Sequence, residues 1–355
     1  MPVAVPAQVE WLVTDRCDLR CLHCSTWRTG PAREFTTAEA LSLADTLARL
    51  RVPTVTLSGG EPLARADLTD ICARLTGQGV RVLVTTNGTL VTAEKAYRLA
   101  AAGPSVLVSL DGADAATHDR LRGTRGAFAA AVRAIGMLQN YGVFHVGVSV
   151  TVSGLNVDKL GDIVRLASLI GSDSLTLRLC MPCGRAQRDY EAMAITPDRF
   201  RRVLEDFVRW RKEFRGRMEI TTLDPLLVLV DPELAAAKAG LAGKEFSGCG
   251  AGRTRCCIWP NGNVTPCAYC DEVAGSVKQE DFATIWRTST VLEPYRDFSA
   301  LVQGVCTGCE HGRACAAGCK SRSYGVYGTP CRPDPMCWVA EKRRAADPGL
   351  ARAGA

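Results

Sequence analysis

The chain has 355 residues, more than one ordinary hydrophobic core needs and fewer than three would use, so we expect one large domain and one smaller one. Its 43 Lys and Arg against 37 Asp and Glu residues give a net charge of +6, and the basic residues are scattered, which argues against a nucleic-acid-binding surface. The first residues lack a signal-peptide pattern and no stretch approaches the ~20 uninterrupted apolar residues that span a bilayer, so the sequence predicts a cytoplasmic protein without membrane contact.

Short β-branched runs alternate with amphipathic stretches from residue 8 to about residue 180. We expect strands at 8–14, 54–58, 81–85, 105–109, 146–152 and 174–178. Helical patterns lie between them at 36–50, 127–141 and 157–170, and the first opens with the capping box Thr36-Thr37-Ala38-Glu39. Six strand–helix units in succession predict an α/β fold, a partial (β/α)6 barrel over residues 1–220, with its chemistry at the C-terminal strand ends.

The pattern changes after residue 220. Thr196-Pro197 predicts the start of a helix that runs to about Phe214, and short segments then carry eleven of the seventeen cysteines. Cysteine richness in a chain without secretion signals favours metal binding over disulfides. We therefore expect a linker over 221–246, a small cysteine-rich domain held together by metal over 247–338, and a tail over 339–355.

Three cysteines follow the first predicted strand within eight residues, in Cys17-Asp18-Leu19-Arg20-Cys21-Leu22-His23-Cys24. Three thiolates on one loop can hold three irons of a four-iron cluster and leave the fourth iron for a chelating ligand. A zinc loop is the alternative, but zinc needs a fourth ligand and His23 is poorly placed to provide it. The C-x3-C-x2-C spacing resembles the signature of the radical S-adenosylmethionine superfamily.

Further motifs of this superfamily stand at the ends of the next three strands, namely Ser58-Gly59-Gly60-Glu61-Pro62, Thr86-Asn87-Gly88 and Ser109-Leu110-Asp111-Gly112. Glycines let backbone approach the cofactor closely, and Glu61 can fix that backbone. The resemblance implies that Arg122 clamps the cofactor carboxylate, and we prefer this role to the alternative of an exposed helix-end charge. The set implied to contact S-adenosylmethionine is His23, Ser58, Gly59, Gly60, Glu61, Asn87, Ser109, Asp111 and Arg122.

The C-terminal cysteines follow a second pattern, Cys249-x12-Gly262-x4-Cys267, then Cys306-x2-Cys309-x5-Cys315-x3-Cys319, then Cys337. Pro260-Asn261-Gly262-Asn263 predicts a hairpin turn that returns Cys267 beside the preceding strand. The pattern resembles the SPASM iron–sulfur domain. The resemblance implies one auxiliary cluster on Cys249, Cys267 and Cys319 and another on Cys306, Cys309, Cys315 and Cys337. A structural zinc site on Cys306, Cys309, Cys315 and Cys319 is the alternative.

Two adjacent residues compete to complete the first auxiliary cluster. Cys256 and Cys257 lie in one predicted strand, whose successive side chains point to opposite faces, so only one of them can reach the cluster. We prefer Cys256, which leaves Cys257 behind the strand.

The resemblance implies three [4Fe-4S] clusters, S-adenosylmethionine as cosubstrate, and an electron donor such as flavodoxin or ferredoxin. A 5′-deoxyadenosyl radical would abstract hydrogen from an unactivated carbon, and an auxiliary cluster would accept a second electron. We expect oxidation of a small polar natural product such as an aminocyclitol or sugar, because the chain starts near its first strand, without a leader-binding segment. The alternatives are a maturase acting on a ribosomally made peptide or protein, and a redox-neutral epimerase.

Two further cysteines stand past the sixth strand, where the substrate should bind. Cys180 or Cys183 could donate a hydrogen atom to a substrate radical, which would make the enzyme an epimerase. Uncoordinated cysteines are more often packed in a core. Ala268 follows Cys267 where sulfatase-maturating enzymes carry an aspartate that acts as a base. Asp271 and Glu272 are the candidates for that role in this sequence.

Overall fold

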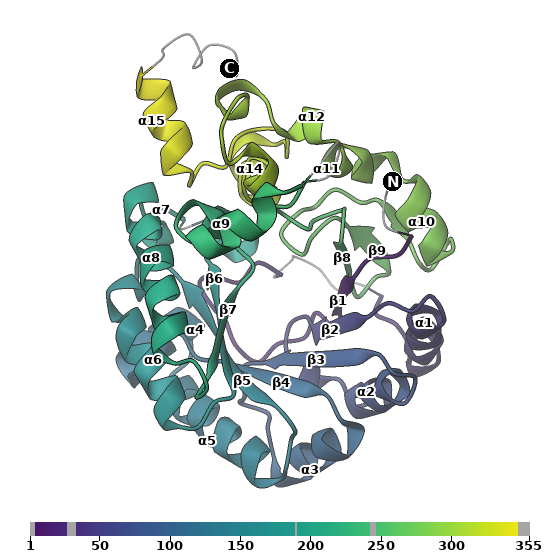
Figure 1. Cartoon of the computed structure of the whole chain (residues 1–355). Coiled ribbons are helices and arrows are strands. Elements are labelled where there is room, and N and C mark those ends of the chain that lie inside the picture. The colour runs from purple at the N-terminus through teal and green to yellow at the C-terminus, as the bar shows by residue number, and fades with distance from the viewer. Residues whose placement is uncertain (1–3, 27–32, 189, 242–245, 347–355) are drawn as a thin grey trace.

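The computed structural model describes residues 4–26, 33–188, 190–241 and 246–346. Figure 1 shows two regions, a curved sheet surrounded by helices on its outer side, and a group of short helices and loops on the open side of that sheet. We call them the barrel (residues 8–222) and the cap (residues 246–346). No helix in the described part of the chain combines the length and apolarity that a membrane crossing requires.

The barrel sheet confirms the six predicted strands, with end points that move by two residues at most. They are β1 (Gln8–Leu12), β2 (Thr54–Ser58), β3 (Arg81–Thr86), β4 (Ser105–Ser109), β5 (Val146–Val152) and β6 (Ser174–Leu179). Each pairs in parallel with the next along the chain. A seventh parallel strand that the sequence did not predict, β7 (Glu219–Thr222), adds to β6. Parallel order places the carboxyl ends of all seven strands at one edge.

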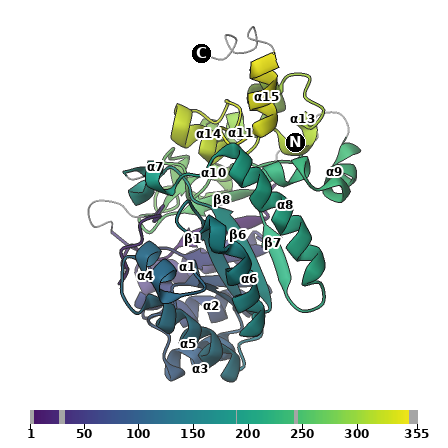
Figure 2. The ribbon, with the colours of Figure 1, turned by 90° about the vertical axis from the view of Figure 1, so that its left-hand side faces the viewer.

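Helices cover the outer face of the sheet, as Figures 1 and 2 show. They are α1 (Thr37–Arg49), α2 (Leu68–Thr76), α3 (Ala93–Ala102), α4 (Ala115–Arg122), α5 (Ala127–Asn140), α6 (Leu160–Leu169) and α8 (Pro197–Glu213). The predicted capping box begins α1, because the Thr36 hydroxyl accepts from the Glu39 N–H and the Glu39 carboxylate accepts from the Thr36 N–H at 2.8 Å. The first of these helices therefore starts where its local sequence signal places it.

Side chains of β1 alternate between two environments. Val9 and Trp11 are buried in the main apolar core, which also contains Leu43 and Leu47 of α1. Residues on the other face, beginning with Gln8 and Glu10, line cavities inside the barrel. This alternation makes the outer face of the strand a packing surface and the inner face a binding surface.

The cap continues the barrel sheet. Strand β8 (Arg255–Ile258) pairs in parallel with β1, β9 (Asn263–Thr265) pairs antiparallel with β8, and β10 (Gly275–Ser276) pairs with β9. The predicted hairpin is confirmed, and Gly262 adopts φ 92° in its loop. The ten strands run in the order β10-β9-β8-β1-β2-β3-β4-β5-β6-β7, so β10 and β7 are the two edges and the barrel stays open.

The remaining elements are short. The chain between β6 and β8 includes α7 (Tyr190–Met193) and α9 (Pro232–Ala239). The cap contains α10 (Phe282–Thr288), α11 (Glu293–Arg296), α12 (Phe298–Leu301), α13 (Gly312–Cys315), α14 (Lys320–Tyr327) and α15 (Trp338–Ala346). A buried ion-pair network joins cap to barrel: Arg322 of α14 contacts Asp334 at 2.6 Å and also Asp224, which follows β7.

Candidate functional site

A cavity opens at the carboxyl ends of the barrel strands, where the sequence motifs were expected to meet. The three cysteines of the first loop line it together with seven of the residues expected to contact the cofactor. These lining residues are Cys17, Cys21, Cys24, His23, Ser58, Gly59, Gly60, Asn87, Ser109 and Arg122. Five segments far apart in sequence therefore converge on one site, as a parallel sheet requires.

The cysteine loop is held by a residue that the motifs do not include. The Arg185 backbone N–H donates to the Cys24 carbonyl at 2.8 Å, and its Nη1 donates to the Cys21 carbonyl at 3.1 Å. Gly184 before it has φ 59°, and a Cβ there would lie 2.5 Å from the Cys24 carbonyl oxygen. The segment after β6 thus fixes two of the three cysteine backbones, and only a glycine fits this approach.

The Gly59-Gly60 pair has a structural reason that differs from the expected one. A Cβ on Gly59 would lie 2.4 Å from the Thr14 carbonyl oxygen, and one on Gly60 would lie 2.3 Å from the Arg16 carbonyl oxygen. The Gly60 N–H also donates to the Thr14 carbonyl at 2.7 Å. The glycines border the cavity, but their missing side chains make room for the backbone that leads into the cysteine loop.

Two residues expected to touch the cofactor, Glu61 and Asp111, lie behind the cavity wall rather than on it. The Glu61 carboxylate accepts from the Thr86 hydroxyl at 2.7 Å, the Asn87 N–H at 2.7 Å and the Leu63 N–H at 3.0 Å. Burial raises the pKa of Glu61 to about 7 even though these hydrogen bonds lower it. Glu61 therefore ties the β2 end to the β3 end and acts on the site through the backbone.

Asp111 lies behind the same cavity wall and contacts the side chains of Arg122 and His23. Its carboxylate is fully buried, lies 2.8 Å from Arg122 Nη2 and 3.6 Å from His23 Nε2, and accepts from the Thr151 N–H at 2.7 Å. Burial lowers the pKa of His23 to about 4, so the imidazole is neutral at pH 7. Arg122 is thus already paired and is not an exposed helix-end charge; its Nη1 also lies 3.8 Å from the Cys21 sulfur.

Four of the predicted auxiliary ligands border a second cavity, deeper in the barrel and against the cap. Cys249, Cys256, Cys267 and Cys319 line it, together with Gln8 of β1, Thr56 of β2 and Leu177 of β6. The Cys249 and Cys319 thiols are hydrogen-bonded to each other although they lie 70 positions apart in the chain. The first auxiliary set is therefore brought together as the resemblance implied.

The remaining four predicted auxiliary ligands border a third, small cavity within the cap, namely Cys306, Cys309, Cys315 and Cys337. Cys319 lies with Cys249 at the second cavity instead. This separation weighs against the zinc alternative, which requires Cys319 beside Cys306, Cys309 and Cys315. Among the described residues, no three Cys, His, Asp or Glu side chains converge tightly enough to hold one metal ion; the cysteines surround cavities instead.

The first and second cavities meet at a polar group that the sequence did not indicate. Glu10 of β1, Arg178 of β6 and Tyr269 of the cap line both cavities, as do Leu179 and Met181. The Arg178 guanidinium is hydrogen-bonded to the Tyr269 side chain, and its buried Nε atom has no hydrogen-bond partner in the described part of the chain. The alternation of β1 and β6 predicts which faces these residues share, but no motif marks them.

Cys180 lines the first cavity, whereas Cys183 is buried nearby and is not part of its lining. Burial raises the pKa of the Cys180 thiol to about 12, so it remains protonated. Of the two candidate hydrogen donors, only Cys180 is thus placed at the cavity wall.

The three cavities have the ligands that the implied iron–sulfur clusters and S-adenosylmethionine require. The first cavity combines three cysteines on one loop with two buried nitrogens, His23 Nδ1 and Arg122 Nε, that have no hydrogen-bond partner among the described residues. Three thiolates plus polar donors suit a four-iron cluster with a chelating ligand. The second and third cavities each have four cysteines at their rims, which suits one further cluster each.

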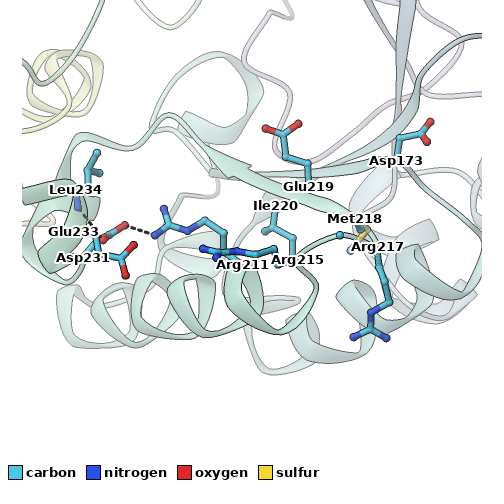
Figure 3. Close-up of a pocket in the computed structure, with 11 residues that line it drawn as sticks. Asp173, Arg211, Arg215, Arg217, Met218, Glu219, Ile220, Asp231, Glu233 and Leu234 are labelled. Carbon is cyan, nitrogen blue, oxygen red and sulfur yellow. Dashed lines mark hydrogen bonds and ion pairs between the residues drawn. The ribbon is translucent and has the colours of Figure 1, made fainter. Parts of the chain in front are cut away.

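A separate surface hollow lies at the other end of the barrel, at the amino ends of β6 and β7 (Figure 3). Asp173, Glu219 and the C-terminal turns of α8 line it, and Arg211 pairs there with Asp231 at 2.7 Å. Ligands of parallel sheets bind at the carboxyl ends of the strands, and none of the predicted site residues lines this hollow.

Comparisons with known proteins agree with this geometry. A sequence model of the radical SAM superfamily matches residues 11–167, and one of an iron–sulfur cluster-binding domain, SPASM, matches residues 249–310. The chain is 34% identical over 343 residues to an AdoMet-dependent heme synthase of Methanosarcina barkeri, covering 94% of this chain and 96% of the relative. It is 33% identical over 340 residues to the mycofactocin maturase MftC of Mycolicibacterium smegmatis, covering 94% and 82%.

Two solved structures share the fold. Streptococcus suis SuiB bound to its precursor peptide SuiA superposes with a TM-score of 0.77 at 18% identity, covering 95% of this chain and 77% of that one. Native anSMEcpe with bound AdoMet superposes with a TM-score of 0.71 at 16% identity, covering 97% and 98%.

Proposed function

The chain belongs to the radical SAM superfamily and carries a SPASM iron–sulfur domain, and from this we propose that it oxidises a substrate held where the first and second cavities meet. The observation that carries the proposal is the shared wall of Glu10, Arg178, Leu179, Met181 and Tyr269. A molecule bound there would contact the cysteine-loop side and the auxiliary-cysteine side at once. Hydrogen abstraction and electron removal then need no movement of the substrate.

With a cluster on Cys17, Cys21 and Cys24 and S-adenosylmethionine bound, the first cavity would supply a 5′-deoxyadenosyl radical that takes a hydrogen atom from an unactivated carbon. The chain's own contribution is position and exclusion of water. Arg185 and the Glu61 hydrogen bonds hold the loops on either side of the cavity. Asn87 and Thr89 bind the Asp18 carboxylate within the cysteine loop, the Asn87 contact measuring 2.9 Å.

The overall change is a two-electron oxidation. The substrate would lose one hydrogen atom and then one further electron, which a cluster held by the cysteines at the second cavity would accept, and it would release one proton. Glu10 is the carboxylate that lines both cavities, so we assign it as the proton acceptor. Asp271 and Glu272, the sequence-based candidates for this role, line neither cavity, and Glu272 accepts from the Tyr295 hydroxyl at 2.6 Å.

Arg178 points to the substrate class. The Arg178 guanidinium is hydrogen-bonded to Tyr269 and interacts with the Glu10 carboxylate, and its buried Nε atom is left without a hydrogen-bond partner in the described part of the chain. We therefore assign Arg178 as the anchor for an anionic group, a carboxylate, on the substrate. The relatives named above are a heme synthase and a maturase, and a solved neighbour binds a precursor peptide. None of these descriptions supports the aminocyclitol or sugar expected from the sequence.

A peptide or protein carrying a carboxylate near the reacting carbon is the candidate favoured by these relatives, and the 94% overlap with the mycofactocin maturase supports it. A small carboxylated molecule is the second candidate, favoured by the 34% identity to the heme synthase. We propose flavodoxin or ferredoxin as the electron donor in either case.

The test is cleavage of S-adenosylmethionine by anaerobically reconstituted full-length protein. We expect close to three four-iron clusters per chain and formation of 5′-deoxyadenosine under reductant. Replacing Cys17, Cys21 and Cys24 together by alanine should remove one cluster and all cleavage. Cys72→Ala is the matched control, because Cys72 is fully buried in α2 and lines none of the three cavities. Cleavage that survives the triple substitution contradicts the proposal.

The anchor is tested separately with Arg178→Gln. A residue that binds substrate rather than cofactor should leave S-adenosylmethionine binding and substrate-free cleavage unchanged. Arg122→Gln is the comparison, because Arg122 lies beside Cys21 and should weaken both. Loss of cofactor binding in Arg178→Gln contradicts the substrate assignment.

A further inference from the structure

The fourth ligand of the cluster proposed for the second cavity is undecided. Four cysteines line this cavity, but the side chain of one of them lies on the other face of its strand. Cys249, Cys267 and Cys319 belong to the cap loops and to the start of α14. Cys256 belongs to β8, whose pairing with β1 settles which face its side chain occupies. The register pairs Gln8 with Arg255, Val9 with Cys256 and Glu10 with Cys257.

Register partners in a sheet share a face. Val9 points outward, and Cys256 lies with it in the main apolar core. Gln8 and Glu10 point inward, toward the cavities. Cys256 thus borders the second cavity while its side chain occupies the packing face of the strand. Cys257 is on the inner face, but it packs with Leu12, Trp259 and Ala268.

Cys270 lies on the cap loop after β9 and packs beside the thiols of Cys249 and Cys267. It packs in one cluster with Cys267, and Cys249 lies against that cluster. The Ser321 hydroxyl lies 3.3 Å from the Cys270 sulfur and is also hydrogen-bonded to the Cys267 thiol, so one hydroxyl holds both sulfur atoms. Ser321 is two residues after Cys319, whose thiol is hydrogen-bonded to that of Cys249. The four thiols therefore lie near one another around the first turn of α14, and Cys270 is the one among them that does not line the second cavity.

We infer that Cys270, and not Cys256, is the fourth ligand of the first auxiliary cluster, an inference that rests on the three clusters of the proposed function. The ligand set is then Cys249, Cys267, Cys270 and Cys319. The spacing from Cys267 to Cys270 leaves two residues between the sulfurs, which lets one loop provide two thiolates to a cluster. The Ser321 hydroxyl, 3.3 Å from the Cys270 sulfur, can donate a hydrogen bond to it, and the Tyr295 hydroxyl, which donates to Glu272, lies 3.7 Å from the same sulfur.

The experiment compares Cys270→Ala, Cys256→Ala and Cys257→Ala in a chain that already carries alanine at Cys17, Cys21 and Cys24, so that only the auxiliary clusters contribute. Iron and acid-labile sulfide are counted after reconstitution, and electron paramagnetic resonance is recorded on the reduced protein. We expect Cys270→Ala to lose up to about four irons per chain or to change the spectrum of one cluster. Cys256→Ala and Cys257→Ala should keep the iron content and the spectrum of the parent.

Cys270→Ser covers the case in which the alanine variant does not fold. A serine oxygen can still bind iron, so this variant should retain iron while the signal of one cluster shifts. A cysteine that only packs in the core would leave that signal unchanged.

The outcomes separate the inference from the function it rests on. Parent spectra and full iron in both Cys270 variants overturn the inference, as does loss of a cluster in Cys256→Ala or Cys257→Ala alone. A parent protein that never holds two auxiliary clusters contradicts the proposed function instead, whatever the Cys270 variants do.

Discussion

The barrel and the cap are stabilised in different ways. The barrel has a continuous apolar core that runs from β1 through α8, and this core extends into the cap as far as Ile258 of β8, Val264 of β9 and Trp286 of α10. In the cap, strands are two to four residues long and several helices have four residues. Much of its burial is in small apolar clusters that contain cysteines. We therefore expect the barrel to fold on hydrophobic burial, and we expect the cap to depend in addition on the iron–sulfur clusters that its cysteines would bind.

The two regions are nevertheless coupled. Strand β8 of the cap extends the barrel sheet, and the Arg322 network joins α14 to the segment after β7. Gly325 of α14 also lies against Pro182, since a Cβ there would be 2.8 Å from the proline ring. Pro182 belongs to the same segment as Gly184 and Arg185, which hold the cysteine loop. The cap thus contacts the barrel at several points, and one of them lies in the segment that holds the cysteine loop.

The largest effect should follow removal of iron from the cap. Cys306→Ala is expected to lower the iron content by about four atoms per chain and to speed amide hydrogen exchange across residues 246–346, while strands β2 to β5 stay protected. Cys331→Ala is the control, a cap cysteine outside both implied ligand sets. Uniform loss of protection in both regions would contradict the comparison. Stoichiometric zinc with no iron deficit would favour a structural zinc site.

A smaller effect should follow loss of the Arg322 charge. Arg322→Met leaves Asp224 and Asp334 buried without their cation, and breaking a buried pair costs about 3–5 kcal/mol. The Asp334 carboxylate also accepts from the Cys319 N–H at 2.7 Å, so cluster loading should fall as well. Urea unfolding, followed separately in the barrel and the cap, measures the loss of stability, and iron analysis measures the loss of cluster loading. The exposed Lys342→Met in α15 is the control, and equal stability of the two variants would show that the network does not join the regions.

Titration of Glu61 should make the free energy of unfolding of the barrel depend on pH. Its folded pKa of about 7 exceeds its ordinary value, so its contribution to the free energy of unfolding is fully present below pH 4.5 and is lost as pH rises through 7. Relative to Glu61→Gln, the wild type should lose at most about 1.4 kcal/mol per pH unit over that range. Anaerobic urea unfolding at several pH values measures this difference.

Glu39→Gln is the control for this experiment. The Thr36 hydrogen bonds lower the pKa of Glu39, so its contribution is lost as pH falls and has the opposite sign. A pH dependence of equal sign in the two variants would contradict the assignment for Glu61.

The smallest effect is expected for Cys180 and Cys183. Alanine at either position should leave 5′-deoxyadenosine formation unchanged, and product made in deuterium oxide should carry no deuterium at the reacting carbon, as dehydrogenation requires. Cys180 is nevertheless a protonated thiol at the cavity wall. Deuterium at that carbon, lost in Cys180→Ala, would contradict oxidation and make the enzyme an epimerase.

The sequence by itself determined six of the barrel strands, the outer helices α1, α5, α6 and α8, and the cysteine motifs, because periodicity, capping and loop spacing are local properties that a short segment expresses alone. It placed the motifs at the strand ends, and parallel pairing then brought them together. β7 was missed because its four residues are too few to show a period.

Tertiary structure alone decided which side chains share a site. Arg185 and Cys21 are 164 positions apart, and Arg178 meets Tyr269 only because the cap extends the barrel sheet beside β1. The choice among Cys256, Cys257 and Cys270 depends on the register between β8 and β1 and on the start of α14. Such contacts arise from the packing of distant segments, and no local pattern in any one segment records its partner.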